Sequence, residues 1–388
     1  MLKVISDEKK PIKLWLDDIE DSALQQARNL ANLPFTFKHV AIMPDSHAGY
    51  GMPIGGVLAA EKTIIPNAVG VDIGCGMCAV KTSLPEIEKE KLIDIVKDIK
   101  RTVPVGFNWH KKKQDPDLMP EKLSKDEMPV VNEQYERALH QVGTLGGGNH
   151  FIEIQKGSDG FIWIMIHSGS RNIGKTVADY YNKLAVKLNE KWRIEVPKKW
   201  ELAFLPVETD EAKLYMNEMQ YCINFAFANR KLMMDNIKQI LTRKLRDVDF
   251  DNMINIAHNY AAWENHFKKN VLVHRKGATR AYEGEFGIIP GSQGTKSYIV
   301  QGLGNEESFK SCSHGAGRTM GRRQAMRELD LENEKRKLDK QGIIHGMESR
   351  KHLDEAPSAY KNIDVVMNNQ KDLVKIFVEL QPLAVVKG

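Results

Sequence analysis

The sequence has little cysteine, few aromatic residues and no long apolar run. Its four cysteines, Cys75, Cys78, Cys222 and Cys312, are too few for a disulfide framework in a chain of 388 residues, which predicts a reducing, intracellular setting. No stretch resembles the roughly 20 apolar residues of a membrane span. The first eight residues also lack the apolar segment of a signal peptide. We therefore expect a cytoplasmic protein that does not contact a membrane.

A strong charge of one sign is also missing. The chain has 56 Lys and Arg residues against 51 Asp and Glu residues, a formal net charge of +5. This balance allows a polyanionic partner but does not require one. Hydrophobic residues make up 42% of the sequence, as in globular proteins, and the length is sufficient for a large buried core.

Apolar periodicity predicts helices and strands without regular alternation. Helices are expected at residues 18–32, 84–100, 175–192, 210–245 and 318–340, and strands at residues 161–167, 271–274, 285–300 and 383–386. Residues 108–131 read as an exposed, charged loop. The methionines at helical spacing in residues 210–245 indicate core packing. This irregular order favours an α+β fold over a doubly wound sheet.

Residues 311–318, SCSHGAGR, place His314 among small residues. Gly315 and Gly317 would let backbone N–H groups approach a ligand closely. Arg318 and Arg322 have helical spacing, and their guanidinium groups would suit phosphate. Taken alone, the segment fits a nucleophilic or phosphate-binding histidine and a glycine-rich turn equally well.

Residues 169–176, GSRNIGKT, match the Walker A pattern of P-loop NTPases. A strand pattern precedes them and a helix pattern follows, so Lys175 would bind phosphates and Thr176 would bind magnesium. However, no apolar strand ending in aspartate supplies a Walker B partner. The preceding strand also ends in His167, which a phosphate cradle does not need. A P-loop NTPase therefore stays an alternative.

Residue types that bind transition metals are spread along the chain. Asp72 and Cys75 lie in a glycine-rich turn, and His150, His167 and His258 each lie at the edge of an expected strand. Each histidine alone could be structural, and Cys75 and Cys78 alone could be a redox pair or two buried thiols. Together the five residues predict a transition-metal centre, for which zinc, iron and manganese are all suitable.

These motifs together resemble the RtcB family of RNA-splicing ligases, which join a 3′-phosphate or 2′,3′-cyclic phosphate RNA end to a 5′-hydroxyl end. The resemblance covers nearly the whole chain, through residues 44–47, 72–75, 146–153, 167–171, 258–259, 275–280, 290–297, 314–318 and 385–388. It implies one ligase domain over residues 1–388, with mainly antiparallel sheets and flanking helices around a deep metal-containing cleft. It also assigns residues 168–171 to a family motif, which makes the Walker match coincidental.

The resemblance implies a role for each motif. His314 would be the nucleophile that takes GMP from GTP. Two manganese ions would be held by Asp72, Cys75, His150, His167 and His258, with the Cys75 thiolate bridging them. The GTP contacts would be Asn149, His150, Phe151, Ile152, Glu153, His258, Asn259, Pro290, Gly291, Ser292, Gln293, Ser297, His314, Gly315, Ala316, Gly317, Tyr360 and Lys387. Among them, Glu153 and Lys387 would read guanine, and Phe151 and Tyr360 would flank it.

The implied partners are GTP, RNA with the ends named above, and an activating protein such as archease. Asn172 and Gln293 depart from the residues expected most often in the family. Gln293 borders the phosphate-binding turn, so a difference from the family is expected in nucleotide preference or rate. A metal-dependent nucleic-acid phosphoesterase that does not ligate is a further alternative.

Overall fold

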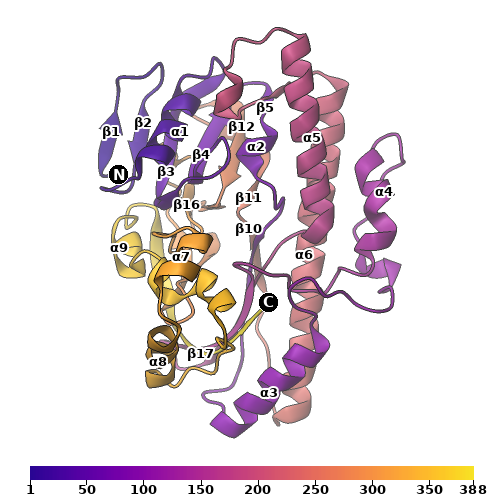
Figure 1. The fold of residues 1–388 in the computed structure, drawn as a ribbon, viewed down its shortest axis with the longest axis vertical. Helices are drawn as coiled ribbons and strands as arrows, with labels where there is room; N and C mark the ends of the chain where they lie inside the picture. Colours follow the sequence, from indigo (N-terminus) through magenta and orange to yellow (C-terminus); the bar gives the residue numbers. More distant parts are fainter.

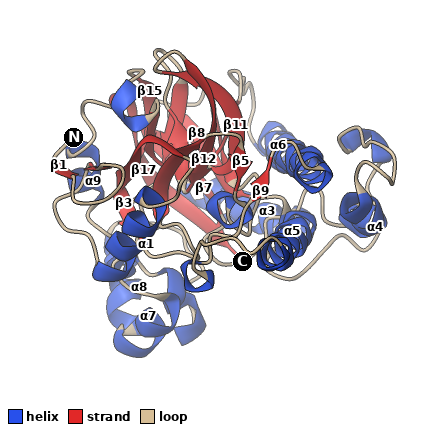
Figure 2. Cartoon of the chain, turned by 90° about the horizontal axis from the view of Figure 1, so that it is seen from above, coloured by secondary structure: helices blue, strands red, loops and turns tan.

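The computed structural model describes all residues 1–388. The chain forms two large sheets, almost entirely antiparallel, with helices packed against their outer faces (Figures 1 and 2). This arrangement confirms the α+β class. No helix combines the length and the apolar character that crossing a membrane would need.

The first sheet has six strands. Their order is β1 (Lys3–Ile5), β2 (Ile12–Leu14), β3 (Thr36–His47), β4 (Ile54–Ala60), β12 (Lys269–Lys276) and β11 (Asn259–His266), and only β2 and β3 pair in parallel. Helix α1 (Asp21–Ala31) buries its alanines and Leu30 against one face. The small pair β13 (Ala278–Arg280) and β16 (Ser311–Ser313), with α9 (Ile363–Asn368), packs against the other.

The second sheet has seven strands. Their order is β10 (Ile254–Ala257), β6 (Gly76–Lys81), β8 (Ile162–Ser168), β7 (Phe151–Gly157), β17 (Val374–Lys387), β15 (Ser297–Gly302) and β14 (Phe286–Ile289). All seven residues of β8 are buried, because the sheet is covered on both faces. Helices α3 (Lys89–Thr102) and α6 (Asp210–Lys244) cover one face, and α8 (Leu331–Lys340) with the 3-10 segment η4 (Arg350–Glu355) covers the other.

Helix α6 is the longest element, with 35 residues. At 1.5 Å per residue it extends about 52 Å, and α5 (Arg171–Lys191) packs alongside it (Figure 1). Met219, Met233 and Ile237 of α6 are buried in the core, which confirms that the methionine stripe serves packing. The remaining short elements are α2 (Pro66–Val69), α4 (Pro129–Ala138), β5 (Thr63–Ile64) and β9 (Leu205–Pro206).

Three expected elements differ from those observed. The helix expected from residue 84 begins at Lys89, so Pro85 precedes it and does not occupy its first turn. The strand expected over residues 383–386 is the end of the longer strand β17, whereas the short strands expected over residues 285–300 are present as β14 and β15. The helix expected over residues 318–340 is also divided, into α7 (Arg322–Glu328) and α8, because the Asp330 side chain caps α8 by accepting the N–H of Asn333.

This division changes the arginine pattern. Arg318 lies before α7 and forms an isolated β-bridge with Tyr360. Arg318 and Arg322 therefore do not share one helix face, and the helical spacing expected for them is wrong. Their side chains nevertheless reach the same carboxylate, as described below.

The two sheets meet at His258. Strand β10 of the seven-stranded sheet ends at Ala257, and β11 of the six-stranded sheet begins at Asn259. At this crossing a single residue, His258, separates a strand of one sheet from a strand of the other. The residues expected to carry chemistry gather around this crossing.

Candidate active site

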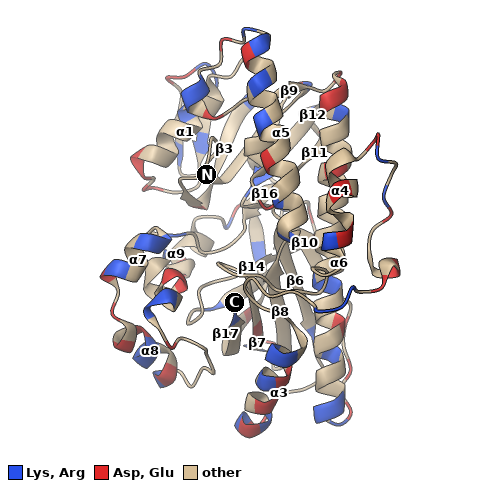
Figure 3. Ribbon diagram, turned by 45° about the vertical axis from the view of Figure 1, so that its right-hand side comes forward, with Lys and Arg blue, Asp and Glu red and all other residues tan.

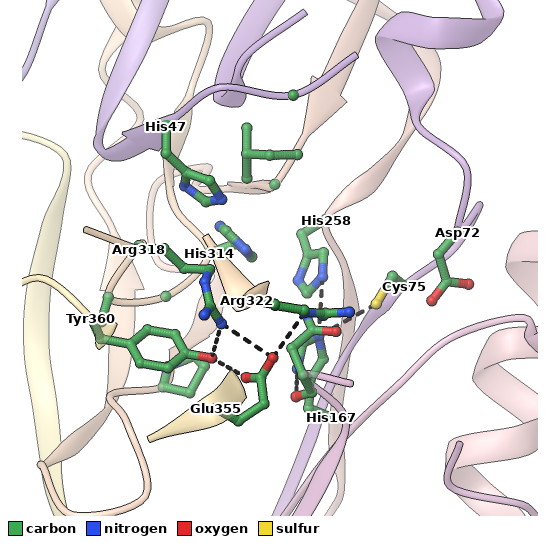
Figure 4. A pocket seen from close by; sticks show the side chains of 18 of the residues that line it. His47, Asp72, Cys75, His167, His258, His314, Arg318, Arg322, Glu355 and Tyr360 are labelled. Carbon is green, nitrogen blue, oxygen red and sulfur yellow. Dashed lines mark hydrogen bonds and ion pairs between the residues drawn. The ribbon is translucent and has the colours of Figure 1, made fainter. Parts of the chain in front are cut away.

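A cavity of about 850 Å³ opens between the two sheets (Figure 4). Residues that are far apart in the sequence line it, and most of the expected nucleotide contacts are among them. The expected contacts that line it are Asn149, Phe151, Glu153, His258, Asn259, Pro290, Gly291, Ser292, Gln293, His314, Gly315, Ala316, Gly317, Tyr360 and Lys387. The fold therefore places the separate motifs around one space.

The five expected metal ligands lie together at one end of the cavity. The Cys75 Sγ atom is 3.3 Å from His167 Nε2 and 3.5 Å from His150 Nε2. His150 Nε2 is also 3.2 Å from Asp72 Oδ2, and His167 Nε2 is 3.4 Å from His258 Nε2. These atoms form two sets of three, Asp72–Cys75–His150 and Cys75–His167–His258. Cys75 is common to both sets.

The histidine tautomers make this cluster suitable for a cation. The Nδ1–H of His150 donates to the Leu145 carbonyl at 2.9 Å, and that of His167 donates to the Asn149 carbonyl at 3.0 Å. In the neutral imidazole the Nε2 atom then has a lone pair and no proton. The lone pairs of these two Nε2 atoms thus lie beside the Cys75 sulfur with no N–H hydrogen between them, an arrangement that a metal ion would stabilise.

Burial reinforces this donor set. It lowers the pKa of His167 and of His258 well below the ordinary range, so both rings stay neutral at physiological pH. Burial also raises the pKa of the Cys75 thiol well above its usual value, with the Asp72 charge adding to the effect. A cation at this position would favour the thiolate instead. The residues present therefore fit a two-ion site with one shared sulfur ligand.

Arg230 of α6 ties the ligand-bearing segments together from behind. Its Nη1 donates to the carbonyls of Gly74 at 3.0 Å and Ser168 at 2.8 Å, and its Nε donates to Asn255 Oδ1 at 2.7 Å. Gly74 precedes Cys75, Ser168 follows His167, and Asn255 lies in the strand that leads to His258. Arg230 is fully buried and has no carboxylate within ion-pair distance. One side chain thus fixes three ligand segments.

His314 follows β16 and projects into the cavity beside His258, with ring centroids 4.8 Å apart. Its Nδ1–H donates to Asp45 Oδ2 at 2.6 Å, and the backbone N–H groups of His314 and Gly315 donate to the same oxygen. Burial would raise the pKa of Asp45, but His314 together with His47 and Lys361 outweighs burial, and the pKa lies below its ordinary value. The hydrogen bond leaves His314 Nε2 free to act as a nucleophile.

The other end of the cavity contains a cluster of charged groups around Glu355 (Figure 4). This buried carboxylate pairs with Arg318 at 3.1 Å, Arg322 at 3.0 Å and Lys387 at 3.4 Å, and it accepts the hydroxyl of Tyr360. Burial opposes ionisation of Glu355, but the three cations hold its pKa below the ordinary value. A single carboxylate therefore organises several expected nucleotide contacts.

Strand alternation separates the expected contacts of β7. Phe151 and Glu153 line the cavity, whereas Ile152 faces the opposite side and packs in the core with Ile154. Only the backbone of Ile152 is available to a ligand. Burial raises the pKa of Glu153 to about 8, although Lys387 acts in the opposite direction.

The turn over residues 290–297 is built by its own hydroxyl groups. Ser297 Oγ accepts the N–H of Gly291 at 3.2 Å, and Thr295 Oγ1 accepts that of Ser292 at 2.7 Å. The Gln293 side chain donates to the Glu355 carbonyl at 2.8 Å. Gln293 is thus linked to the charged cluster around Glu355, and the Ser297 hydroxyl stabilises the turn by its hydrogen bond with Gly291.

The Walker-like segment does not form a phosphate loop. Helix α5 begins at Arg171, so Gly174, Lys175 and Thr176 all lie within the helix. Lys175 pairs with Asp179 on the exposed surface, and the Thr176 hydroxyl donates to the Asn172 carbonyl one turn earlier. The residues that would wrap around a phosphate in a P-loop are helical here, so the P-loop alternative is wrong. Cys78 also points away from Cys75, into the core beneath α6, which removes the redox pair.

Asp45, Arg230 and Glu355 were not expected as site residues. Asp45 lies in residues 44–47, one of the segments that resemble the RtcB family. It also lies near the end of a long apolar strand, a position that indicates a buried carboxylate. Arg230 stands in the apolar stripe of α6, four residues from Ala226 and three from Met233, which marks it as a buried cation. Nothing in the sequence around Glu355 distinguishes it.

Comparison with known proteins agrees with this geometry. The family model described as tRNA-splicing ligase RtcB matches residues 26–127 and 115–388. The chain is 40% identical to the RNA-splicing ligase RtcB of Escherichia coli K12, over 100% of this chain and 99% of that protein. It is 33% identical to the tRNA-splicing ligase RtcB of Nanoarchaeum equitans (97% and 95% covered) and 31% identical to that of Thermococcus kodakarensis (95% and 92% covered). With matches over its whole length and a site assembled from the same motifs, this chain belongs to the RtcB family.

Proposed function

We propose that this protein is an RNA ligase that joins an RNA 3′-phosphate or 2′,3′-cyclic phosphate end to a 5′-hydroxyl end and uses GTP for activation. The observation that carries the proposal is His314, held by Asp45 beside two potential metal-ligand sets that share Cys75. A nucleophile next to a cation site is what a nucleotidyl transfer requires.

His314 supplies the nucleophile. Because Asp45 accepts the Nδ1–H, the lone pair on Nε2 can attack the α-phosphorus of GTP. The bond from the α-phosphorus to the bridging oxygen breaks, and pyrophosphate leaves. Asp45 then stabilises the positive charge that develops on the imidazole, as the aspartate does in a Ser-His-Asp catalytic triad.

Two manganese ions, held by Asp72, Cys75, His150, His167 and His258, would neutralise phosphate charge and polarise the phosphorus centre. The residues around them fix the ligand geometry. Arg230 holds the three ligand segments, and the carbonyls of Leu145 and Asn149 orient the imidazoles. This support keeps the donor atoms convergent before any ion binds.

The nucleotide would lie along the cavity from His314 toward Lys387. Glu153 offers carboxylate oxygens for the N–H donors of guanine, with Lys387 nearby, and Phe151 and Tyr360 offer ring faces. The N–H groups of Gly315, Gly291 and Ser292 already donate within the protein. Those of Ala316, Gly317 and Gln293 have no partner and would be the backbone donors available to the phosphates. This arrangement supports GTP as the nucleotide.

The ligation step follows from the activated histidine. Transfer of GMP from His314 to the RNA 3′-phosphate gives an RNA end with GMP as its leaving group. The 5′-hydroxyl oxygen then attacks the former 3′-phosphate, a phosphodiester forms, and GMP departs. A 2′,3′-cyclic phosphate would first be hydrolysed to the 3′-phosphate by water. Arg171, whose guanidinium lies near Gly146 and Asp72, would bind RNA phosphate.

We further propose that residues 1–388 act as one ligase domain in the cytoplasm, and that an activating protein such as archease supports repeated turnover. We expect the pure protein to complete about one round of ligation per molecule and then stop. Addition of archease should restore repeated turnover, which would support this part. Unaided turnover at the same rate would contradict it.

The test is incubation of the protein with manganese and α-labelled GTP, followed by denaturation. We expect an acid-labile label on the protein that disappears in His314→Ala and persists in Lys175→Ala. Addition of a 3′-phosphate RNA and a 5′-hydroxyl RNA should then yield a joined product. Absence of the label in the wild-type protein would overturn the mechanism. Labelling or phosphate hydrolysis without joining would leave the phosphoesterase as the better description.

A further inference from the structure

The loop between α3 and α4 carries an aromatic side chain that packs against nothing. Phe107 is 102% exposed, the highest value among the large apolar residues of the chain. Single exposed apolar residues are common on protein surfaces and need no explanation by themselves. The surroundings of Phe107 are what make it informative.

The turn that carries Phe107 is fixed on both sides. The N–H of Asn108 donates to the Val105 carbonyl at 3.2 Å, and Gly106 has a φ of +64°, which favours glycine. The N–H of Gly106 donates to the Gly146 carbonyl at 2.8 Å, and the N–H of His110 donates to the His140 carbonyl at 3.0 Å. The ring is therefore held away from the surface by an anchored turn.

This turn lies beside two segments that lead to residues lining the cavity, Asn149 and Lys387. Gly146, its hydrogen-bond partner, is four residues before the expected metal ligand His150, and Arg171 Nη2 lies 3.5 Å from the Gly106 carbonyl. The C-terminal Gly388 is adjacent to both Gly106 and Gly146. Figure 1 likewise places the C-terminus beside the loop that follows α3. The turn that carries the exposed ring thus passes beside Arg171, where an RNA phosphate is expected to bind.

The residues that follow add positive charge and a second ring. Lys111 and Lys112 are exposed and form no ion pair, whereas Lys113 pairs with Glu136 at 2.6 Å. The Trp109 ring is partly exposed, with the Arg137 guanidinium 4.7 Å from its centroid. Figure 3 shows a basic stretch in this loop, running away from the C-terminus toward the part of the loop that precedes α4. Exposed rings interleaved with cations are typical of surfaces that bind single-stranded nucleic acid.

We propose that Phe107, with Lys111 and Lys112, forms a stacking platform for one base of the single-stranded RNA that enters the cavity. The ring face takes the base, and the lysines lie along the phosphates that follow. This inference rests on the proposed RNA ligase function, because it names where that substrate is held. Base stacking on an aromatic ring is tolerant of sequence, so the platform serves broken RNAs of many sequences.

The test compares Phe107→Ala and Phe107→Trp with the wild-type protein and with Phe377→Ala as a matched control. Phe377 is also an exposed phenylalanine, but it lies on β17 ten residues from Lys387, roughly 33 Å along the strand. Binding of a labelled single-stranded RNA is measured by fluorescence anisotropy, and joining is measured separately. We expect Phe107→Ala to bind about 5- to 100-fold more weakly and to raise the KM for RNA. Phe107→Trp and Phe377→Ala should bind like the wild type.

Abasic RNAs identify the stacked base. Removing the base at one particular position near the joined end should weaken wild-type binding and leave Phe107→Ala unaffected. Formation of the GMP-labelled protein from GTP, which needs no RNA, should be equal in all variants. Wild-type binding by Phe107→Ala, or weak binding by Phe107→Trp, would overturn the platform. Failure of the wild-type protein to join RNA would instead overturn the proposed function, while the anisotropy comparison still tests the platform.

Discussion

Asp45 Oδ2 lies 2.6 Å from His314 Nδ1, although the two residues are 269 positions apart in the sequence. The same oxygen accepts two backbone N–H groups of the His314 segment, so it fixes both the ring and the chain that carries it. Replacement by asparagine retains the shape but removes the charge that stabilises a charged imidazole.

We expect Asp45→Asn to slow formation of the GMP-labelled protein by roughly 10²- to 10⁴-fold. The KM for GTP should change little, because Asp45 does not line the cavity. The rate is measured by labelling with α-labelled GTP. Ser46→Ala is the matched control, since the buried Ser46 hydroxyl has no hydrogen-bond partner. Equal slowing in both variants would indicate a disturbed fold instead of a lost charge.

The shared position of Cys75 predicts metal stoichiometry. Cys75→Ala removes a ligand from both sets, whereas His258→Ala removes one from a single set. We expect two manganese ions per wild-type chain, about one in His258→Ala, and loss of tight binding in Cys75→Ala. Isothermal titration with manganese measures this directly. Cys78→Ala, at a buried cysteine outside the cluster, should retain both ions, and loss of both in that variant would contradict the assignment.

The hydrogen bonds of Arg230 predict an indirect effect on metal affinity. Arg230→Lys retains the positive charge but cannot reach the Gly74 carbonyl, the Ser168 carbonyl and Asn255 at once. We expect manganese affinity to fall about 10- to 100-fold, as for other residues that orient metal ligands. Lys231→Ala, at the exposed neighbouring position on α6, is the control. Unchanged manganese affinity in a folded Arg230→Lys protein would show that the ligand segments hold their positions without it.

The pKa of Glu153, raised to about 8 by burial, predicts how GTP binding depends on pH. Guanine presents N–H donors, which the ionised carboxylate accepts best, so binding requires Glu153 to lose its proton below pH 8. GTP affinity should therefore rise by up to about tenfold per pH unit as pH increases toward 8, and then level off.

Calorimetry at pH 7 in two buffers with different ionisation enthalpies should detect about one proton released for each GTP bound. Glu153→Gln should release one proton fewer, which separates its contribution from that of the triphosphate. Identical proton release in the two proteins would contradict the assignment. The pKa of Glu153 is about 8 in the folded protein and 4.5 as the ordinary value of the unfolded chain. Between these two pH values the unfolded chain has lost the Glu153 proton and the folded protein has kept it, so the contribution of Glu153 to the free energy of unfolding falls as pH rises.

Local patterns in the sequence predicted α6 well, since its apolar period persists for many turns. They failed at residues 318–340, where a capping aspartate divides a polar helix, and at Pro85, which suits a helix start but precedes one. The motif residues around the cavity were identifiable because each stands in an unusual segment. Asp45, Arg230 and Glu355 were not, because each acts through partners contributed by distant segments, and a single sequence does not show which segments meet.

The crossing at His258 has a consequence for how the molecule unfolds. An ion bound to His258 and His167 would join the end of β10 to β8 at the very point where the chain enters the other sheet. Opening this end of the seven-stranded sheet would then break the coordination bonds and release the segment that leads into the six-stranded sheet. With manganese the chain is expected to melt at a temperature that rises with ion concentration. Removal of the ion should lower that temperature, which calorimetry can measure.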